Sequence, residues 1–142
     1  MGRFCTRLGV DADVSTVGTW TQTGAATNHG CVGGDPFDDT KHLEEAAPSV
    51  NDEVVCGYSA NLGTKLGFTP STIDAVVAYS FSEGSGLGCA TTVGDSTSTT
   101  IGSTDSIGAT TTPSKVVAET KPSGGAWSAG DTVRPGFRVI TT

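Results

Sequence analysis

The chain has 142 residues, of which 35% are hydrophobic and only 16% are charged, and its formal net charge is −7 at pH 7. This length fits one domain, and the low charged fraction excludes a charge-rich disordered tail. The acidic balance excludes direct binding to nucleic acid or to an anionic membrane, because both partners require a surface rich in Lys and Arg.

Glycine is unusually frequent, with 20 residues, and Thr and Ser fill long runs of the chain. Gly supplies the positive φ angles that tight turns need, while Thr fits the pleated surface of a sheet. This composition indicates short strands joined by turns. We therefore predict an all-β protein, a single antiparallel β-sandwich or jelly roll with an extended N-terminal arm.

The predicted arm covers residues 1–18, and the predicted sandwich domain covers residues 19–142. The arm has no regular pattern, so we expect it to make few contacts with its own domain and to be held by a neighbouring chain. The arm residues expected to contact that neighbour are Arg3, Phe4, Arg7 and Leu8.

In the first half of the domain, strands are predicted over residues 19–23, 41–45 and 53–59. The second of these lies between an Asp-rich turn signal and Pro48, which together favour a short strand over a helical turn. Residues 25–35 are predicted to form a loop.

The strongest strand signal lies at residues 73–82. Alternation with a period of two predicts that one set of side chains enters the core, namely Ile73, Ala75, Val77, Tyr79 and Phe81. The opposite set consists of Asp74, Val76, Ala78 and Ser80. Burial of one large apolar side chain contributes about 1.5–3 kcal/mol, so this strand is predicted to form the centre of the fold.

In the second half, strands are predicted over residues 89–93, 115–120 and 136–141. The Gly-rich segment 122–126 predicts a turn that brings Trp127 into the domain. Trp127 and Trp20 are expected to anchor the core or an interface, which is the usual role of a large aromatic side chain with one polar group.

No catalytic residue and no cofactor are predicted. The glycines of residues 84–88 lack a following helix that could bind phosphate. The segment Gly57-Tyr58-Ser59-Ala60-Asn61 departs from the nucleophile elbow at its last position. Because only His29 and His42 are available as bases, we do not expect a Ser–His–acid triad.

No metal site is predicted either. The pairs Asp11-x-Asp13 and Asp38-Asp39 lack the distal Glu of a calcium loop, so they are expected to cap turns. The four cysteines are Cys5, Cys31, Cys56 and Cys89. Buried free thiols are the favoured interpretation, disulfides formed in an oxidising medium are the alternative, and zinc is the weakest because only His29-x-Cys31 is closely spaced.

The order of several short motifs resembles a known class of proteins. The motifs are Trp20 in a Gly/Thr context, Asp38-Asp39-Thr40, Thr69-Pro70-Ser71-Thr72, Gly124-Gly125-Ala126-Trp127-Ser128 and the terminal Phe137-Arg138-Val139. In this order they are similar to the small β-sandwich or jelly-roll virion proteins of tailed bacteriophages. The resemblance covers residues 16–142, approximately.

The resemblance implies a non-enzymatic structural role, most specifically that of a capsid decoration or cement protein. Such a protein is made in the host cytoplasm and binds the capsid surface, where it bridges major capsid protein subunits and associates with itself as a dimer or trimer. In this interpretation the arm residues, together with Trp20 and Trp127, form the interface. The alternatives are a tail, neck or baseplate protein and a carbohydrate- or cell-surface-binding module.

Overall fold

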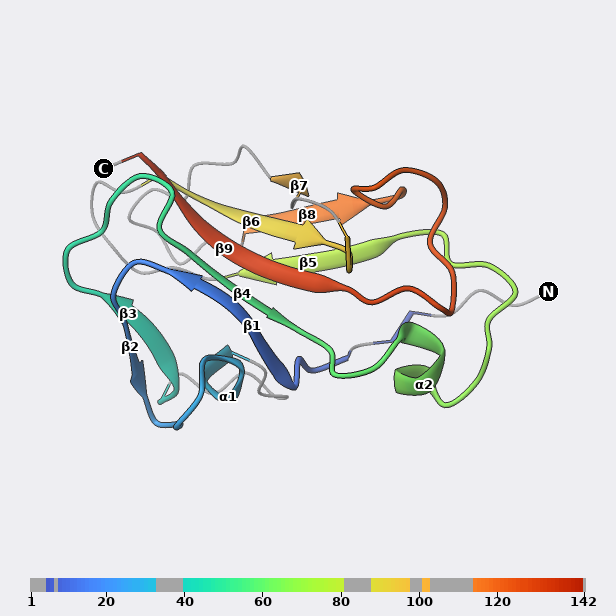
Figure 1. Ribbon diagram of the computed structural model, residues 1–142, viewed down its shortest axis with the longest axis horizontal. Helices are drawn as coiled ribbons and strands as arrows, with labels where there is room; N and C mark the ends of the chain where they lie inside the picture. Colours follow the sequence, from blue (N-terminus) through green and yellow to red (C-terminus); the bar gives the residue numbers. More distant parts are fainter. Residues whose placement is uncertain are drawn as a thin grey trace.

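The computed structural model describes residues 5, 6, 8–32, 40–80, 88–97, 101, 102 and 114–141. Its strands are β1 (Ala12–Val17), β2 (Trp20–Thr23), β3 (His42–Glu45), β4 (Glu53–Gly57), β5 (Val76–Ser80), β6 (Gly88–Gly94), β7 (Ile101–Gly102), β8 (Ser114–Ala118) and β9 (Arg134–Thr141). Two short helices, α1 (Asn28–Val32) and α2 (Leu62–Leu66), complete these elements (Figure 1). The protein is therefore mostly β, as its composition predicts.

The largest sheet has five strands in the order β1-β4-β9-β6-β7, and every neighbouring pair is antiparallel. Its central strand is β9, so the last strand of the chain and not residues 73–82 lies in the middle of the fold. The sheet does not close on itself. Two smaller antiparallel sheets, β2–β3 and β5–β8, accompany it.

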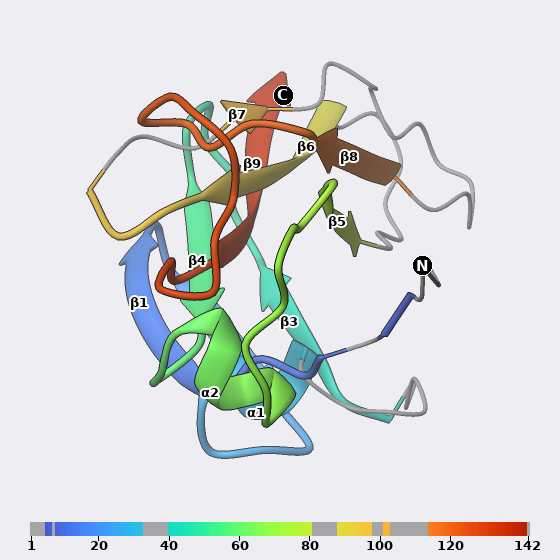
Figure 2. The same cartoon turned by 90° about the vertical axis from the view of Figure 1, so that its right-hand side faces the viewer.

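The main hydrophobic core lies where the β5–β8 sheet packs against β6, on the side of the molecule away from β1 (Figure 2). Its buried members are Leu62, Ala78, Val93, Val116, Ala118, Trp127 and Val133. A smaller cluster joins Cys89 and Val139, with Phe137 packed against them. Trp20 meets the Phe137 ring edge-on, with the ring centroids 6.2 Å apart.

Trp127 enters the main core from a glycine turn, as the sequence predicts. Gly124 and Gly125 both adopt positive φ angles, 99° and 80°, which a side chain would disfavour. Only 3% of Trp127 is exposed, and its Nε1 donates to the backbone oxygen of Ala118 at 2.9 Å. The indole thus has its one polar atom satisfied inside the core.

The faces of β5 are opposite to those predicted. Ala78 is buried and Val76 packs against the core, whereas Val77 and Tyr79 are exposed. Regular pairing with β8 begins only at Val76, and Ile73 reaches the core through an isolated bridge to Trp127. The irregular residues between Ile73 and Val76 shift the alternation by one position, and a shift of one residue exchanges the two faces of a strand.

The N-terminal segment belongs to the fold further upstream than predicted. Residues 12–17 form β1, which pairs with β4 at the edge of the large sheet. Leu8 is half-buried against the main core, and its backbone oxygen accepts a hydrogen bond from the Tyr58 hydroxyl at 3.1 Å. The remaining predicted arm residues, Arg3, Phe4 and Arg7, lie outside the described residues.

The predicted loop over residues 25–35 contains α1 instead. A bulge in β1 explains how this helix is attached, because the register skips from Asp13, opposite Cys56, to Ser15, opposite Val55. An extra residue in one strand changes which side chains share a face. Asp13 and Thr16 consequently lie on the same face of β1, and both reach α1.

Candidate functional site

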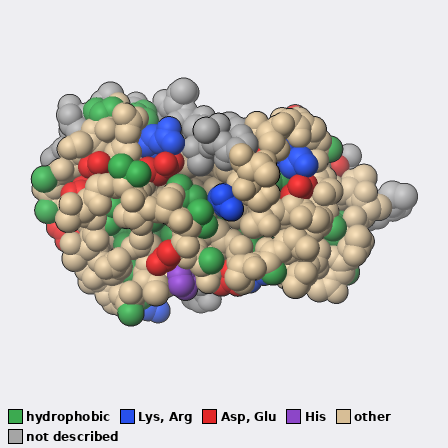
Figure 3. All heavy atoms as spheres, in the orientation of Figure 1, with side chains coloured by type: hydrophobic (Ala, Val, Ile, Leu, Met, Phe, Trp, Pro, Cys, Tyr) green, Lys and Arg blue, Asp and Glu red, His purple; other side chains and the backbone are tan. Residues whose placement is uncertain are grey.

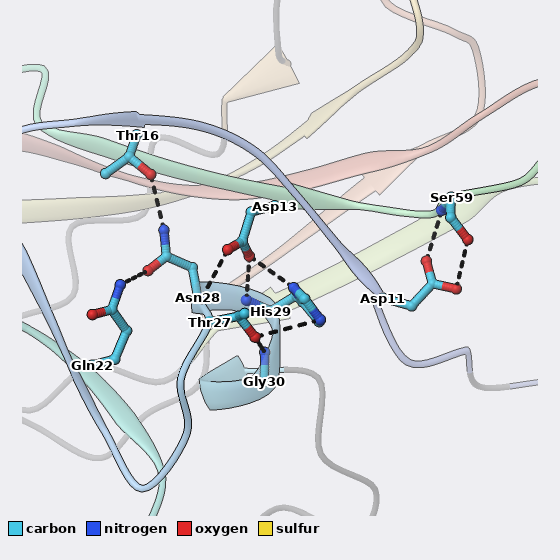
Figure 4. A network of polar contacts seen from close by, with 9 residues as sticks. All are labelled: Asp11, Asp13, Thr16, Gln22, Thr27, Asn28, His29, Gly30 and Ser59. Atoms are coloured by element: carbon cyan, nitrogen blue, oxygen red, sulfur yellow. Dashed lines mark hydrogen bonds and ion pairs between the residues drawn. The ribbon is translucent and has the colours of Figure 1, made fainter.

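A network of polar contacts joins β1 to the first turn of α1 (Figure 4). The Asp13 carboxylate accepts hydrogen bonds from the backbone N–H groups of Asn28, at 3.1 Å, and His29, at 2.6 Å. It also contacts Nδ1 of the His29 ring at 2.9 Å. A carboxylate is favourable at this position because the N-terminal N–H groups of a helix lack partners within the helix.

Thr27 caps the same helix from within its own chain segment. Its Oγ1 accepts the N–H of Gly30 at 3.2 Å, and its backbone oxygen accepts the N–H of Cys31 at 3.2 Å. Thr27 Oγ1 also lies 3.4 Å from Nε2 of His29. The first four N–H groups of α1 therefore all have acceptors.

Burial alone would raise the pKa of Asp13, but the hydrogen bonds from His29 and Asn28 outweigh this effect and lower the pKa. Asp13 is thus a carboxylate that is stabilised in its charged form. A group of this kind is a weak proton acceptor, since a general base works best with a pKa near the operating pH.

Asp13, His29 and Thr27 follow the order carboxylate, imidazole, hydroxyl that is found in hydrolase triads. However, the Thr27 hydroxyl already serves as a helix cap, and the neighbouring N–H groups are bound to Asp13 and Thr27. Hydrolysis of this type needs free donors that stabilise the developing oxyanion. The geometry fits a network that holds α1 against the sheet better than it fits catalysis.

Asn28 extends the network between strands. Its side chain is buried, donates to Thr16 Oγ1 at 2.9 Å and accepts from Gln22 Nε2 at 2.7 Å. Since these partners belong to β1 and β2, one amide side chain ties α1 to both strands. No local pattern in the sequence indicates this role, because the partners are 6 and 12 residues away.

The four cysteines are free thiols. Cys31, Cys56 and Cys89 are buried and Cys5 is exposed, in agreement with the favoured interpretation of buried thiols for three of the four. Burial, followed by the negative charge of Asp13, raises the pKa of Cys56 to about 12. Because the thiolate is the reactive form, Cys56 is a poor nucleophile.

A second aspartate network fastens the start of the chain to the segment before α2. Asp11 accepts hydrogen bonds from the N–H and the hydroxyl of Ser59, at 2.7 and 3.0 Å, and pairs with Lys65. The bond from Lys65 and those from Ser59 lower the pKa of Asp11 to about 2. Asp11 and Asp13 bind different elements, so they do not act together as ligands of one cation.

Two further aspartates fix the turn region around Trp127. Asp95 is only 2% exposed and accepts hydrogen bonds from the N–H groups of Thr97 and Ser123, both at 2.9 Å. Asp131 accepts from Ser128 N at 2.7 Å and pairs with Lys121 at 3.0 Å. In both carboxylates burial raises the pKa, and the hydrogen bonds outweigh it and lower the pKa.

An open, shallow hollow lies beside α2, between Phe68 and Ala129. The Asn61 side chain, one of its polar lining groups, is occupied as the N-cap of the helix and accepts from Thr64 N at 2.9 Å. The charged side chains of the molecule do not line this hollow, whose polar side chains are those of Asn61, Thr64 and Thr69.

Three of the predicted interface residues lie in the part of the chain that the structure describes. Trp127 lies in the core, Leu8 is half-buried against that core, and Trp20 packs on Phe137 with its Nε1 donating to Val17 O at 2.8 Å. Within the described residues there is no group of three or more His, Cys, Asp or Glu side chains placed to hold a metal ion.

Comparisons of the chain with family models, with curated proteins and with solved structures give no match. Among the described residues, no helix has the length and apolar character needed to cross a membrane.

Proposed function

We propose that this chain is a non-enzymatic structural protein of a bacteriophage virion, built on a domain of the β-sandwich or jelly-roll type. Its most specific role is that of a capsid decoration protein, which binds the outer shell and bridges neighbouring major capsid subunits. The order of the sequence motifs motivates the virion setting. The observation that supports a non-enzymatic role is that the aspartates form hydrogen bonds with the protein's own backbone.

Among the residues that the structure describes, at least five aspartates accept hydrogen bonds from backbone N–H groups of loops, turns or helix ends. They are Asp11, Asp13, Asp52, Asp95 and Asp131. Catalytic carboxylates have to be available to a substrate, whereas these are occupied by the protein itself. A protein that must keep one shape while attached to a particle benefits from loops that are fixed in this way.

A decoration protein that binds only the assembled shell stabilises it by mass action, and the effect grows with occupancy. The charge distribution supports a protein partner. Acidic and basic side chains are interspersed on the face seen in Figure 3, and the described residues on this face form no extended basic patch. Binding to nucleic acid would require such a patch.

Quantitative mass spectrometry of purified particles tests the proposal. We expect the chain in many copies per particle, and we expect particles that lack it to release their genome at a lower temperature. A few copies per particle would indicate a tail, neck or baseplate position, and absence from purified particles would refute the virion role.

The predicted role of the arm is tested by deleting residues 2–7. This deletion removes Arg3, Phe4 and Arg7 but keeps Leu8 and Asp11, which contact the folded domain. If the arm contacts the shell, occupancy on the particle falls while the melting temperature of the free chain is unchanged. Unchanged occupancy would exclude the arm from the interface.

A carbohydrate-binding module is a second candidate because Tyr79, predicted to be in the core, is an exposed aromatic side chain. Aromatic rings of this kind offer an apolar face and a polar tip to a ligand. Glycan-array binding that Tyr79→Ala abolishes would favour this candidate. An array with no binding would leave the structural role as the better supported one.

A further inference from the structure

The outward face of the β5–β8 sheet carries apolar side chains that the fold leaves in solvent. Val77, Tyr79 and Val117 are 43%, 61% and 51% exposed, while their neighbours Ala78, Val116 and Ala118 are buried in the core. Val77 lies directly opposite Val117 in the register of the two strands. The centre of this face is therefore a pair of valines, with Tyr79 beside it.

Two opposite charges flank this centre, Lys115 on β8 and Glu119 directly after the last residue of this strand. Exposed and buried residues alternate from Lys115 to Glu119, so Lys115, Val117 and Glu119 lie on the outward face. Lys115 is opposite Tyr79. Neither Lys115 nor Glu119 forms an ion pair with the residues that the structure describes. The two charges cancel locally, although the chain as a whole carries −7.

We propose that a second copy of this chain binds to this face, with the two β5–β8 sheets stacked face to face and their β8 strands antiparallel. A two-fold axis that crosses the strands at Val117 places Val117 against Val117 of the partner subunit. The same axis places Lys115 opposite Glu119 of the partner subunit, and this occurs twice. Such an isologous contact is the commonest arrangement of homodimers.

The charge pattern selects the second copy over other occupants. A negatively charged polymer or membrane would gain from Lys115 and be repelled by Glu119. A two-fold copy, in contrast, matches each charge with its opposite and covers the valines at the same time. Stacking with parallel strands would instead place Lys115 over the partner subunit's Tyr79 and leave both charges unmatched.

The dimer is expected to be weak. Stable interfaces bury about 800 Å² on each partner, and a face formed by two strands of five residues each is considerably smaller. We therefore expect dissociation constants of about 10 μM to about 1 mM. Association would be substantial wherever the chain is concentrated. This inference goes beyond the proposed virion role, and the isolated chain tests it.

Sedimentation velocity on the full chain, from about 10 μM to about 1 mM, measures the association. A reductant is needed because Cys5 is an exposed thiol that offers a route to covalent dimers. Wild-type protein is expected to shift from monomer to dimer across this range. If the chain stays monomeric at all concentrations, the inference is wrong. Glycan binding at Tyr79 without dimerisation would also contradict it.

Charge reversal tests the geometry. Lys115→Glu or Glu119→Lys replaces two attractive contacts with two repulsive ones, so each is expected to weaken dimerisation about tenfold or more. The double variant K115E/E119K restores the matched pairs and is expected to return the dissociation constant to within about threefold of wild type. If the double variant remains monomeric, the antiparallel stacking is wrong.

Glu44→Lys is the matched control, because Glu44 is exposed on β3 and the change alters the net charge by the same amount as Glu119→Lys. It is expected to leave dimerisation unchanged or slightly stronger. An equal weakening by Glu44→Lys and Glu119→Lys would show that overall charge, not this face, controls association. Val117→Thr, at an exposed position, is expected to weaken dimerisation without unfolding the chain.

Discussion

At Gly136 the central strand has no room for a side chain. A Cβ atom there would lie 2.5 Å from Thr92 Oγ1 and 3.1 Å from the backbone oxygen of Val54. Gly136→Ala is therefore expected to lower the free energy of unfolding by about 1–3 kcal/mol, because an extra methyl group in a packed region forces neighbouring atoms to move. Urea denaturation measures this loss. Gly130→Ala is the control, because the nearest atom to its Cβ is 3.9 Å away, and its unfolding midpoint is expected to stay near wild type.

Thr92, the cross-strand neighbour of Gly136, carries a buried hydroxyl that has no hydrogen-bond partner in the part of the chain that the structure describes. Val has nearly the same shape as Thr but lacks the hydroxyl. Thr92→Val is therefore expected to raise the free energy of unfolding by about 1 kcal/mol, the lower end of the cost of an unsatisfied buried polar group. A variant less stable than wild type would show that the hydroxyl has a partner.

Asp95 satisfies several donors at once, so its removal is expected to cost more than the loss of a surface charge. Asp95→Ala leaves the N–H groups of Thr97 and Ser123 without this acceptor. We expect a loss of about 1–3 kcal/mol in the free energy of unfolding, measured by urea denaturation at neutral pH. Glu44→Ala removes an exposed carboxylate and is expected to change stability by less than about 0.5 kcal/mol.

At the scale of elements, β8 offers a direct test of which strand face is buried. Val116 is 6% exposed and points to the core, whereas its neighbour Val117 is half exposed. Val116→Thr places a hydroxyl among apolar side chains and is expected to cost about 1–3 kcal/mol. Val117→Thr is expected to change the unfolding free energy by less than about 0.5 kcal/mol. Equal losses in the two variants would contradict the assignment of faces.

Local strand and turn signals locate most strands in the sequence. The segments predicted at residues 19–23, 53–59 and 89–93 correspond closely to β2, β4 and β6. The faces of β5 could not be predicted in the same way. Alternation divides the side chains of a strand into two sets, but it does not say which set meets the core. Here the irregular residues between Ile73, which bridges to Trp127, and Val76, where pairing with β8 begins, decide this.

The two helices differ in how well the local sequence predicts them. α2 carries its signals locally, because Asn61 caps its start and Gly67, with a φ of 76°, ends it. For α1, Thr27 is a local signal, but the stronger anchor is Asp13, whose carboxylate comes from a strand 15 residues upstream. No local pattern predicts that pairing, because it depends on the bulge that turns Asp13 towards the helix.

At the scale of the whole molecule, the aspartates fasten turns, helix ends and segments that are distant in the sequence. Asp13 ties α1 to the large sheet, Asp11 ties the start of the chain to the segment before α2, and Asp95 and Asp131 hold the turns around Trp127. The pKa of each of these four carboxyl groups is lowered in the folded state. The stability of the whole fold is consequently linked to pH.

The sign of this linkage follows from the direction of the shifts. For Asp11 the pKa falls from 3.8 to about 2 on folding, so between these values the unfolded chain binds more protons than the folded one. The free energy of unfolding then increases with pH. The contribution of the four carboxylates is complete above about pH 5, and it is lost as the pH falls through their folded-state pKa values.

We therefore expect the urea midpoint to fall steeply below about pH 4. Asp131→Asn removes the carboxylate that binds Ser128 and Lys121, so this variant should be less stable at pH 7 and should lose less stability on acidification. Glu44→Gln, at an exposed position, controls for the loss of one charge and should follow the wild-type curve. Parallel curves for wild type and Asp131→Asn would show that Asp131 does not contribute to the linkage, and a flat wild-type curve would contradict the role assigned to all four carboxylates.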